Sequence, residues 1–438
     1  MKLGLIALSG VRVLDPELLA LGQTLPGFAE RGRTIAALPS LGLLTLAGLV
    51  PAEFDVRYVE VDELPHDLGE LGDFDVVALS FVTARARAAY VLADRFRAIG
   101  VRVVMGGLHV TAVPDEALDH ADAIVLGEAE AVWPALLHDL QRGTLRARYD
   151  GRKVAFDLAD APLPRFELLE GRAVARYTVQ TQRGCPWDCE FCAASIRLRP
   201  GLRVKPAQKI RAEVRAIQAL APRPFLELAD DNTFASPAHG RRVCDALAPL
   251  GLRWFTETDV SFGDDEDLIA RAADAGCVQV LIGLESPSAR ALDGVERTRD
   301  WKATQAGRYL DAIERIQRRG IAVNGCFVLG LDGAGPEQFD ATLDFVRDSG
   351  LQEVQVTVQT AFPGAPLYDR LAREGRLLAP DAWERCTLFD VSFAPVGVTV
   401  EELRAGLHRL TAALYAPDAV AERRARFRAA RRGPAARG

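Results

Sequence analysis

The chain has 438 residues, a formal net charge of −7 and 49% hydrophobic residues. This length predicts two or three domains, and the composition is typical of a soluble globular protein. The acidic balance argues against a general nucleic-acid binder, which usually has a basic surface. The chain has seven cysteines, three of them in one short segment, and this is not the pattern of a secreted disulfide framework.

Neither export nor membrane insertion is indicated near the N-terminus. Residues 1–10 contain one Lys and a short apolar run with no small-residue cleavage site after it, which favours a first β-strand over a signal peptide. The stretch from Thr34 to Ala52 lacks charge, but Pro39, Gly42 and Pro51 interrupt it, so a transmembrane helix is the less favoured interpretation. We therefore expect a cytoplasmic protein without a transmembrane segment.

Residues 1–145 alternate short apolar runs with helical stripes. The helical stripe at 89–99 ends at Gly100, a residue suited to a C-terminal cap. Strand–helix alternation with nearly continuous apolar strands indicates α/β structure, here a doubly wound, flavodoxin- or Rossmann-like parallel domain. The expected strands are Lys2–Leu8, Val56–Val61, Asp75–Ser80, Arg102–Met105 and Ala123–Leu126.

Residues 146–174 are polar and contain Pro162 and Pro164, and we interpret them as a linker. A second series of βα units follows over 175–375. Six units in about 200 residues suit a partial (β/α)6 barrel of the TIM type, with its chemistry at the carboxyl ends of the strands. The expected strands are Thr178–Gln182, Phe225–Leu228, Trp254–Thr258, Gln279–Leu284, Ala322–Leu329 and Glu353–Thr360.

Residues 376–438 form a C-terminal extension, for which the sequence predicts one helix at Glu401–Ala413. The stretch from Glu422 to Gly438 contains seven Arg and one acid. Such a tail either contacts an anionic surface or, as the more common case, is solvated and frayed.

One segment carries three cysteines at the spacing of an iron–sulfur site: Cys185, Cys189 and Cys192. Three thiolates in a loop directly after a strand can bind three irons of a cubane [4Fe–4S] cluster and leave the fourth iron open to substrate. A tetrahedral structural zinc would need a fourth ligand. The next candidates along the chain are the distant His239 and Cys244. A zinc or redox site is therefore the lesser alternative.

This CxxxCxxC motif resembles that of the radical S-adenosylmethionine (SAM) superfamily, because aromatic Phe191 precedes the last cysteine and the motif follows the first strand of a βα barrel. The resemblance implies a [4Fe–4S] cluster and SAM as cofactors. In that family the open iron chelates the amino and carboxylate groups of SAM. An electron from the cluster then breaks the sulfonium–C5′ bond and gives a 5′-deoxyadenosyl radical.

The resemblance also implies SAM contacts at the ends of later strands, where family members hold the methionine amino group, the ribose and carboxylate, and the adenine. An Asp pair at a strand end is by itself more often an N-cap or loop feature. The prediction of SAM binding therefore depends on finding all of these contacts together, in the family's order and at the strand ends. The implied SAM-binding residues are Phe191, Asp230, Asp231, Asn232, Gly283, Glu285, Ser286 and Gly330.

Glycine-rich strand ends in the first domain surround the crevice where doubly wound sheets bind ligands. Adjacent glycines let a large planar ligand approach the backbone. The arrangement, with the helix that begins near Pro39, is similar to the cobalamin (B12)-binding domain that precedes the barrel in one radical SAM subfamily. The implied cobalamin-binding residues are Ser80, Gly106, Gly107, His109, Gly127 and Glu128.

The Asp-x-His-x-x-Gly motif, by which other cobalamin proteins ligate cobalt from below, is absent. Many radical members lack it and bind the corrin without a His ligand. His109 is a candidate lower ligand, although a His that donates to a loop carbonyl is the more common case. A domain that no longer binds cobalamin and only packs on the barrel is a further alternative.

The resemblance implies a cobalamin-dependent methyltransferase that acts on an unactivated carbon. One SAM methylates cobalt, a second yields the radical that removes a substrate hydrogen, and the carbon radical takes the methyl group from methylcobalamin. We assign no catalytic base, since the sequence shows no Ser-His or Cys-His constellation. The segments 324–327, 359–368 and 386–390 look similar to family members that act on hopanoid lipids or bacteriochlorophyll precursors. This resemblance implies a small, hydrophobic, lipid-like or secondary-metabolite substrate. The expected reductant is a flavodoxin or a ferredoxin.

Two other functions remain open on the sequence. The first is a radical SAM cyclase or oxidoreductase of the same architecture, as in bacteriochlorophyll ring formation. It would release deoxyadenosine without S-adenosylhomocysteine. The second is a non-catalytic cluster or corrin sensor, which would not cleave SAM. The strand-end residues Asp231, Glu285 and Gly330 argue against a sensor, since a sensor would not need them.

Overall fold

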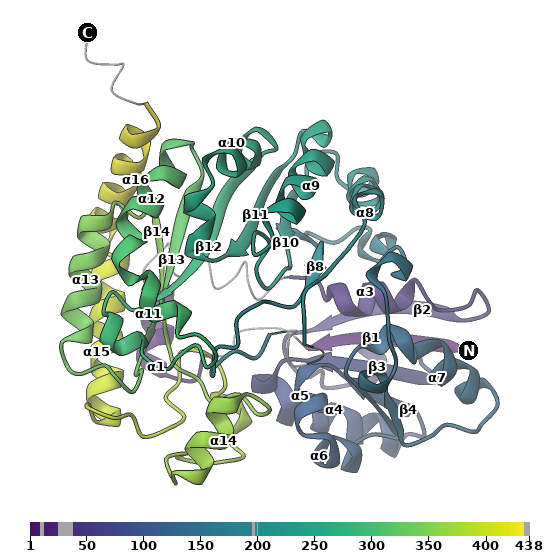
Figure 1. Cartoon of the computed structure of the whole chain (residues 1–438). Coiled ribbons are helices and arrows are strands. Elements are labelled where there is room, and N and C mark those ends of the chain that lie inside the picture. Colours follow the sequence, from purple (N-terminus) through teal and green to yellow (C-terminus); the bar gives the residue numbers. More distant parts are fainter. Residues whose placement is uncertain (9–12, 25–37, 195–197, 199, 433–438) are drawn as a thin grey trace.

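The chain forms two six-stranded parallel β-sheets, one after the other along the sequence, as the sequence predicts (Figure 1). The protein is described from a computed structural model, which covers all residues except 9–12, 25–37, 195–197, 199 and 433–438. A small two-stranded antiparallel sheet is inserted in the sequence between the first two strands of the second large sheet.

The first sheet has the strand order β2-β1-β3-β4-β5-β6, the doubly wound pattern. Its central strands are buried nearly throughout, because helices cover both faces. The expected helix at 89–99 is α4, and Gly100 follows it at φ +83°. The strands are β1 (Lys2–Leu8), β2 (Asp55–Val61), β3 (Val76–Phe81), β4 (Arg102–Gly106), β5 (Ala123–Leu126) and β6 (Arg148–Asp150). The helices are α1 (Pro16–Thr24), α3 (Leu41–Ala47), α4 (Ala86–Ala98), α5 (Leu108–Ala112), α6 (Pro114–Asp119) and α7 (Trp133–Gln141).

The first sheet has one strand more than the sequence predicts. β6, which pairs in parallel with β5, lies in the segment expected to be a linker. β6 has only three residues, of which Tyr149 is buried. It therefore contains no apolar run by which the sequence could have predicted a strand.

The second sheet has the order β14-β13-β12-β11-β10-β7, an open parallel barrel that confirms the expected six units. The expected first strand is split, because the chain leaves the sheet after Val179 and forms the hairpin of β8 (Gln182–Arg183) and β9 (Arg203–Val204). The barrel strands are β7 (Tyr177–Val179), β10 (Phe225–Leu228), β11 (Arg253–Thr258), β12 (Cys277–Glu285), β13 (Ala322–Leu329) and β14 (Glu353–Val358). The intervening helices are α8 (Ala207–Leu220), α9 (Pro237–Leu247), α10 (Glu266–Asp274), α11 (Trp301–Gln305), α12 (Tyr309–Arg318) and α13 (Gln338–Ser349).

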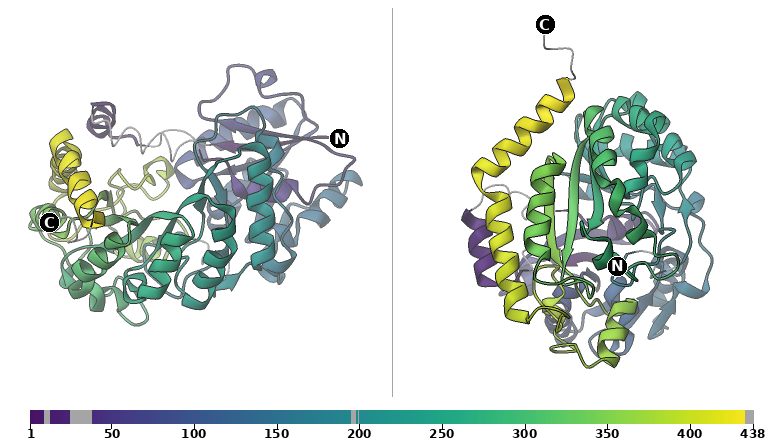
Figure 2. Two further views of the ribbon diagram at one scale, coloured as in Figure 1. Left: turned by 90° about the horizontal axis from the view of Figure 1, so that it is seen from above. Right: turned by 60° about the vertical axis from the view of Figure 1, so that its left-hand side comes forward.

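In the structure we count the C-terminal extension from the end of the last barrel strand, β14, so that it includes residues before 376, and it is more helical than expected. It contains α14 (Pro366–Arg373), α15 (Val400–Tyr415) at the predicted helix, and α16 (Pro417–Arg432). The described part of the Arg-rich tail belongs to α16, which continues at an angle from the end of α15 (Figure 2) and contacts α12. Buried Arg423 and Phe427, four residues apart, form one docking face, so this part is not a frayed tail.

Among the described residues, no helix is long and apolar enough to cross a membrane. The uncharged stretch around Pro39 and Pro51 contributes only the seven-residue helix α3, capped by the Ser40 hydroxyl.

Candidate functional site

The three cysteines lie in the loop that the β8–β9 hairpin closes. Gly184 begins this loop at φ +90°, and a Cβ atom there would lie 2.1 Å from the carbonyl oxygen of Gly201. Only glycine permits both the dihedral angle and this approach. Cys189 is buried, whereas Cys185 and Cys192 are half-buried.

Two of the predicted residues after β10 contact this loop directly. The backbone N–H of Gly184 donates to Asp231 Oδ2 over 2.9 Å. The Asn232 amide nitrogen lies 3.8 Å from Cys185 Sγ and donates to Asp259 Oδ2 at 2.8 Å. Asn232 thus places an N–H donor on a cysteine sulfur, a contact of the kind that tunes iron–sulfur centres.

Glu285 ends β12 at a bulge, with the uncommon φ of +61°. Its carboxylate pairs with Lys302 at 2.8 Å, and both side chains are only 8% exposed. Lys302 also donates to the Gly283 carbonyl at 2.7 Å, and a Cβ on Gly283 would lie 2.4 Å from Glu285 Oε1. Burial raises the pKa of the Cys189 thiol to about 12, although the nearby Lys302 ammonium opposes this rise. The pair therefore brings a cation to the cysteine loop.

Asp230, in contrast, is used by the scaffold. Its carboxylate accepts hydrogen bonds from the backbone N–H and hydroxyl of Thr181, at 2.7 and 2.6 Å. It also accepts from the Gln182 N–H and the Thr233 hydroxyl. The carboxylate fixes the chain between β7 and β8, which positions the start of the cysteine loop.

Three further residues expected to contact SAM have structural partners. The hydroxyl of Ser286 accepts from the Ser288 N–H at 3.1 Å. A Cβ on Gly330 would lie 3.0 Å from the Leu403 side chain, so the extension packs closely against this glycine. Phe191 packs on the edge of the main core. The structure therefore brings Asp231, Asn232 and Glu285 to the loop, and uses the others in packing or in turns.

The crevice of the first domain has a volume of about 280 Å³ and is lined by residues of the first sheet and by residues near the β8–β9 hairpin. Gly107 adopts φ +115° and Gly127 adopts φ +71°, so both need glycine. Five of the six residues expected to bind cobalamin line this crevice, namely Ser80, Gly106, Gly107, Gly127 and Glu128. The part of the chain after residue 175 contributes Gln180, Arg183, Leu198 and Ala229.

His109 does not line the crevice. Its Nε2 lies 3.0 Å from the Tyr90 hydroxyl, and its ring contacts Phe81 and Trp383 on the other side of the sheet. Burial lowers the pKa of His109 to about 4, so the imidazole is neutral at pH 7. The structure therefore offers His109 neither as a cobalt ligand in the crevice nor as a donor to a loop carbonyl.

Comparison with known proteins matches all three parts of the chain. The Radical SAM superfamily model matches residues 179–346, and the B12 binding domain model matches 36–137. Residues 365–437 match a domain of unknown function, DUF4070. The chain contains a radical SAM superfamily domain preceded by a B12-binding domain.

Relatives of this radical SAM protein extend along most of its length. Bacteriochlorophyllide d C-12(1)-methyltransferase of Chlorobaculum tepidum is 26% identical over 393 residues, which cover 87% of this chain and 84% of the relative. The anaerobic magnesium-protoporphyrin IX monomethyl ester cyclase of Rubrivivax gelatinosus is 25% identical over 423 residues, covering 83% and 74%. The radical SAM methyltransferase TsrM from Kitasatospora setae has the same fold, with a TM-score of 0.67 at 16% identity over 95% of this chain and 90% of TsrM.

The donor set fits the [4Fe–4S] cluster of a radical SAM enzyme. Within the described ranges, no three His, Cys, Asp or Glu side chains converge on one metal ion, and a cubane does not require this, since each thiolate binds a different iron. His239, which a zinc site might have used, instead contacts the Thr181 hydroxyl at 3.1 Å. Burial raises the pKa of the Cys185 thiol to about 11, and iron binding would deprotonate it.

The B12-binding domain also fits its cofactor. The glycine backbone of the crevice leaves an open strand end, and its aliphatic floor, which includes Val104 and Val125, suits the apolar face of a corrin. With a volume of about 280 Å³, the crevice holds part of such a ring.

Sequence reasoning missed Glu296, which fixes the cysteine loop from the barrel side. Its buried carboxylate accepts hydrogen bonds from the Asp188 N–H at 3.2 Å, the Thr298 hydroxyl at 2.5 Å and the Arg299 N–H at 2.8 Å. Burial alone would raise the pKa of Glu296, but these hydrogen bonds lower it to about 2. An acidic residue two positions before a Thr is common in turns, so the sequence around Glu296 does not indicate that its carboxylate binds Asp188, 108 residues away.

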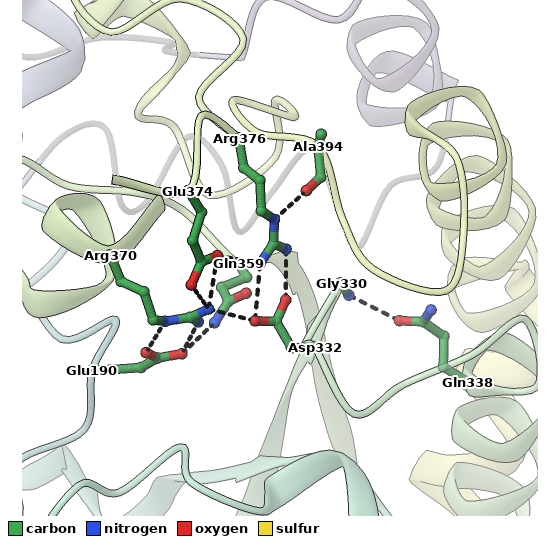
Figure 3. A network of polar contacts seen from close by, with 9 residues as sticks. All are labelled: Glu190, Gly330, Asp332, Gln338, Gln359, Arg370, Glu374, Arg376 and Ala394. Atoms are coloured by element: carbon green, nitrogen blue, oxygen red, sulfur yellow. Dashed lines mark hydrogen bonds and ion pairs between the residues drawn. The ribbon is translucent and has the colours of Figure 1, made fainter. Parts of the chain in front are cut away.

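A second missed group holds the loop from the C-terminal side (Figure 3). Glu190, between two of the cysteines, pairs with Arg370 of α14 at 2.7 Å. Arg370 and Arg376 each contact Asp332, which follows β13, at 2.6 Å. Figure 3 shows the two arginines of the extension converging on these two carboxylates. The extension therefore forms part of the site.

A larger cavity, of about 750 Å³, lies at the opposite, amino-terminal ends of the barrel strands. Arg424, Arg428 and Arg431 of α16 line it. None of the residues expected to bind the cluster, SAM or cobalamin does so, so this cavity is separate from the site.

Proposed function

We propose that this protein is a cobalamin-dependent radical SAM methyltransferase that methylates an unactivated carbon of a small molecule. The single observation that supports this most is the shared crevice. Its walls combine the glycine-rich strand ends of the B12-binding domain with Gln180 and Arg183, which directly precede the cluster cysteines. Two one-electron cofactors held in this way face a common space, as radical methylation requires.

When bound, the cluster and SAM supply a carbon-centred radical by reductive cleavage, and cobalamin supplies the methyl group. The chain's own residues hold and orient these groups. Cys185, Cys189 and Cys192 bind the cluster. Asn232 holds the first of these thiolates through an N–H···S contact.

Two tryptophans shield the cysteine loop. Trp187 of the loop stacks on Trp301 with ring centroids 4.2 Å apart, and its indole N–H donates to Asp259 Oδ2 at 2.8 Å. Large fixed aromatic rings beside the loop reduce access of water, which protects a radical from quenching. The chain needs to position reactants rather than supply a base.

The substrate class and the electron donor follow from similarity alone. The likeness to a bacteriochlorophyllide methyltransferase supports a hydrophobic, lipid-like or secondary-metabolite substrate. We propose a flavodoxin or ferredoxin as the reductant, because the cluster must receive single electrons at low potential.

Anaerobic reconstitution with iron, sulfide and hydroxocobalamin tests the proposal. After desalting, the absorbance spectrum should show both the cluster and the corrin. With SAM and a reductant, the protein should then release S-adenosylhomocysteine as well as 5′-deoxyadenosine. A protein that retains the cluster but loses the corrin would contradict methyl transfer through cobalamin.

The cyclase or oxidoreductase is the second candidate, and the similarity to the anaerobic cyclase supports it. It predicts 5′-deoxyadenosine without S-adenosylhomocysteine in the same assay. A cluster or corrin sensor would give neither product. The assay therefore separates all three functions by their products.

A further inference from the structure

The loop that carries the three cysteines is closed at its base by two arginines. Arg183 and Arg203 are directly opposite in the antiparallel β8–β9 pair, one on each side of residues 184–202. Like charges directly opposite in an antiparallel pair repel each other. This position therefore requires a shared anion to hold both stems of the loop together.

That anion is Glu128 of the B12-binding domain. Arg183 Nη1 lies 2.8 Å from Glu128 Oε1, and Arg203 Nη1 lies 2.8 Å from each of its two oxygens. The Glu128 side chain is 1% exposed, and those of Arg183 and Arg203 are 14% and 22% exposed. Glu130 adds a second carboxylate to Arg183 at 2.5 Å. A buried carboxylate from one domain thus binds both stems of a loop of the other.

The backbone of Glu128 is itself firmly placed. Gly127, before it, adopts φ +71° and donates its N–H to the Thr111 hydroxyl at 2.9 Å. Gly151 packs so closely that a Cβ there would lie 2.1 Å from the Glu128 carbonyl oxygen. Glu128 is therefore a fixed point at the rim of the crevice, from which its carboxylate reaches the loop.

We propose that Glu128 is a positioning residue that holds the cysteine loop in register over the cobalamin crevice. This inference rests on the proposed function, and it gives Glu128 a role other than contact with the corrin. Arginine suits the task, because its planar guanidinium binds carboxylate oxygens at fixed angles and so transmits orientation as well as charge. Displacing a reacting group by 1 Å can reduce a rate by about 100-fold, so register between two cofactors matters.

Glu128→Gln is the main test, because it removes the charge with little change in volume. The full-length protein, reconstituted with iron, sulfide and hydroxocobalamin, is reduced so that cob(II)alamin and the cluster are both paramagnetic. EPR then measures their spin–spin interaction, which depends on the separation and orientation of the two centres. We expect a weaker and broader interaction in E128Q than in the parent.

Hydrogen exchange of the apo-protein gives a readout without cofactors. Amides of residues 183–194 should exchange at least about tenfold faster in E128Q, since a buried ion pair that loses one partner opens more often. Arg183→Lys keeps the charge but loses the planar fork, and should shift both readouts in the same direction by less. Asp15→Asn is the matched control: the Asp15 side chain is 4% exposed and pairs with Arg404 at 3.0 Å, but Asp15 directly precedes α1 and Arg404 belongs to α15, outside the cysteine loop and its stems.

Unchanged spin interaction and exchange in a folded, loaded E128Q protein would overturn the inference. Equal changes in D15N and E128Q would also overturn it, because they would reflect general destabilisation. If E128Q fails to load its cofactors, unchanged exchange over 183–194 in the apo-protein overturns it. If the parent binds no corrin, the proposed function fails, and the exchange experiment still decides whether Glu128 holds the loop.

Discussion

Glu296→Gln tests whether a buried carboxylate holds the cluster loop from the barrel side. Glu296 is 1% exposed and accepts hydrogen bonds from the N–H groups of Asp188 and Arg299 and from the Thr298 hydroxyl. A glutamine keeps one acceptor oxygen, but its NH2 group then faces N–H donors. Because an anion accepts such bonds more strongly than an amide, the loop should lose its attachment at Asp188.

The magnitude follows from the carboxyl's ionisation. Its pKa falls from the ordinary 4.5 to about 2 in the folded protein. Each unit of pKa corresponds to about 1.4 kcal/mol, so the surroundings favour the ionised form of Glu296 by about 3 kcal/mol. We expect E296Q to lose about this much. For a domain of this size, 1 kcal/mol lowers Tm by about 2–4 °C, which gives a decrease of about 6–12 °C for the barrel.

The same carboxylate gives the effect a pH dependence. Since the pKa of Glu296 is lower in the folded state, its contribution is fully present above pH about 4.5 and is lost as the pH falls toward 2. The difference in Tm between parent and E296Q should therefore be constant from pH 7 to 5 and become smaller below that. Calorimetry of the apo-protein at several pH values measures it without interference from acid-labile iron.

Iron content after anaerobic reconstitution is the second readout, and E296Q should bind less iron than the parent. Glu314→Gln is the control, because Glu314 is 69% exposed and only pairs with Arg318 one turn away. If E296Q melts within about 2 °C of the parent at pH 7, well under the expected decrease, and loads the same amount of iron, then Glu296 does not hold the loop.

Three further substitutions test other parts of the site. Gly127→Ala places a Cβ 2.6 Å from the Arg152 side chain at a residue with φ +71°, and this strain should lower the free energy of unfolding by about 1–3 kcal/mol. The variant should also retain less corrin after desalting, and full retention would contradict the crevice assignment. Lys302→Met leaves Glu285 buried and unpaired, and should cost about 3–5 kcal/mol in thermal melts, most of it recovered when Glu285→Gln is added. His109→Ala should leave the absorbance of bound corrin unchanged, because His109 lies outside the crevice; a changed spectrum would make it a cobalt ligand.

The sequence predicted the strands well because both sheets are parallel and helix-covered. Strands that are buried on both faces consist of continuous apolar runs, which are visible in the sequence. Of the twelve strands in the two large sheets, eleven overlap an expected strand. The exception, β6, has a single buried residue, Tyr149. The cluster motif was equally visible, because three thiolates that bind one cubane must lie close together in the chain.

The partners of the loop were not predictable, since each comes from a distant part of the chain. Arg183 and Glu128 are 55 residues apart, and Arg370 and Glu190 are 180 apart. No periodicity or spacing relates such positions. Asp230 shows a role that its place at a strand end did not indicate: its carboxylate accepts hydrogen bonds from Thr181, and its contact with SAM stays a prediction.

These contacts also explain why the N-terminal domain and the extension belong to one functional unit with the barrel. Among the described residues of the loop, only Gly184 and Cys189 are fully buried, and Gly184 adopts a positive φ. Its order therefore depends on ion pairs and hydrogen bonds from outside: Glu128 from the first domain, Glu296 from the barrel and Arg370 from the extension. Each of these attachments forms only after its own part of the chain has folded. Cluster assembly should consequently require all three parts, because a barrel alone would leave two sides of the loop without a partner.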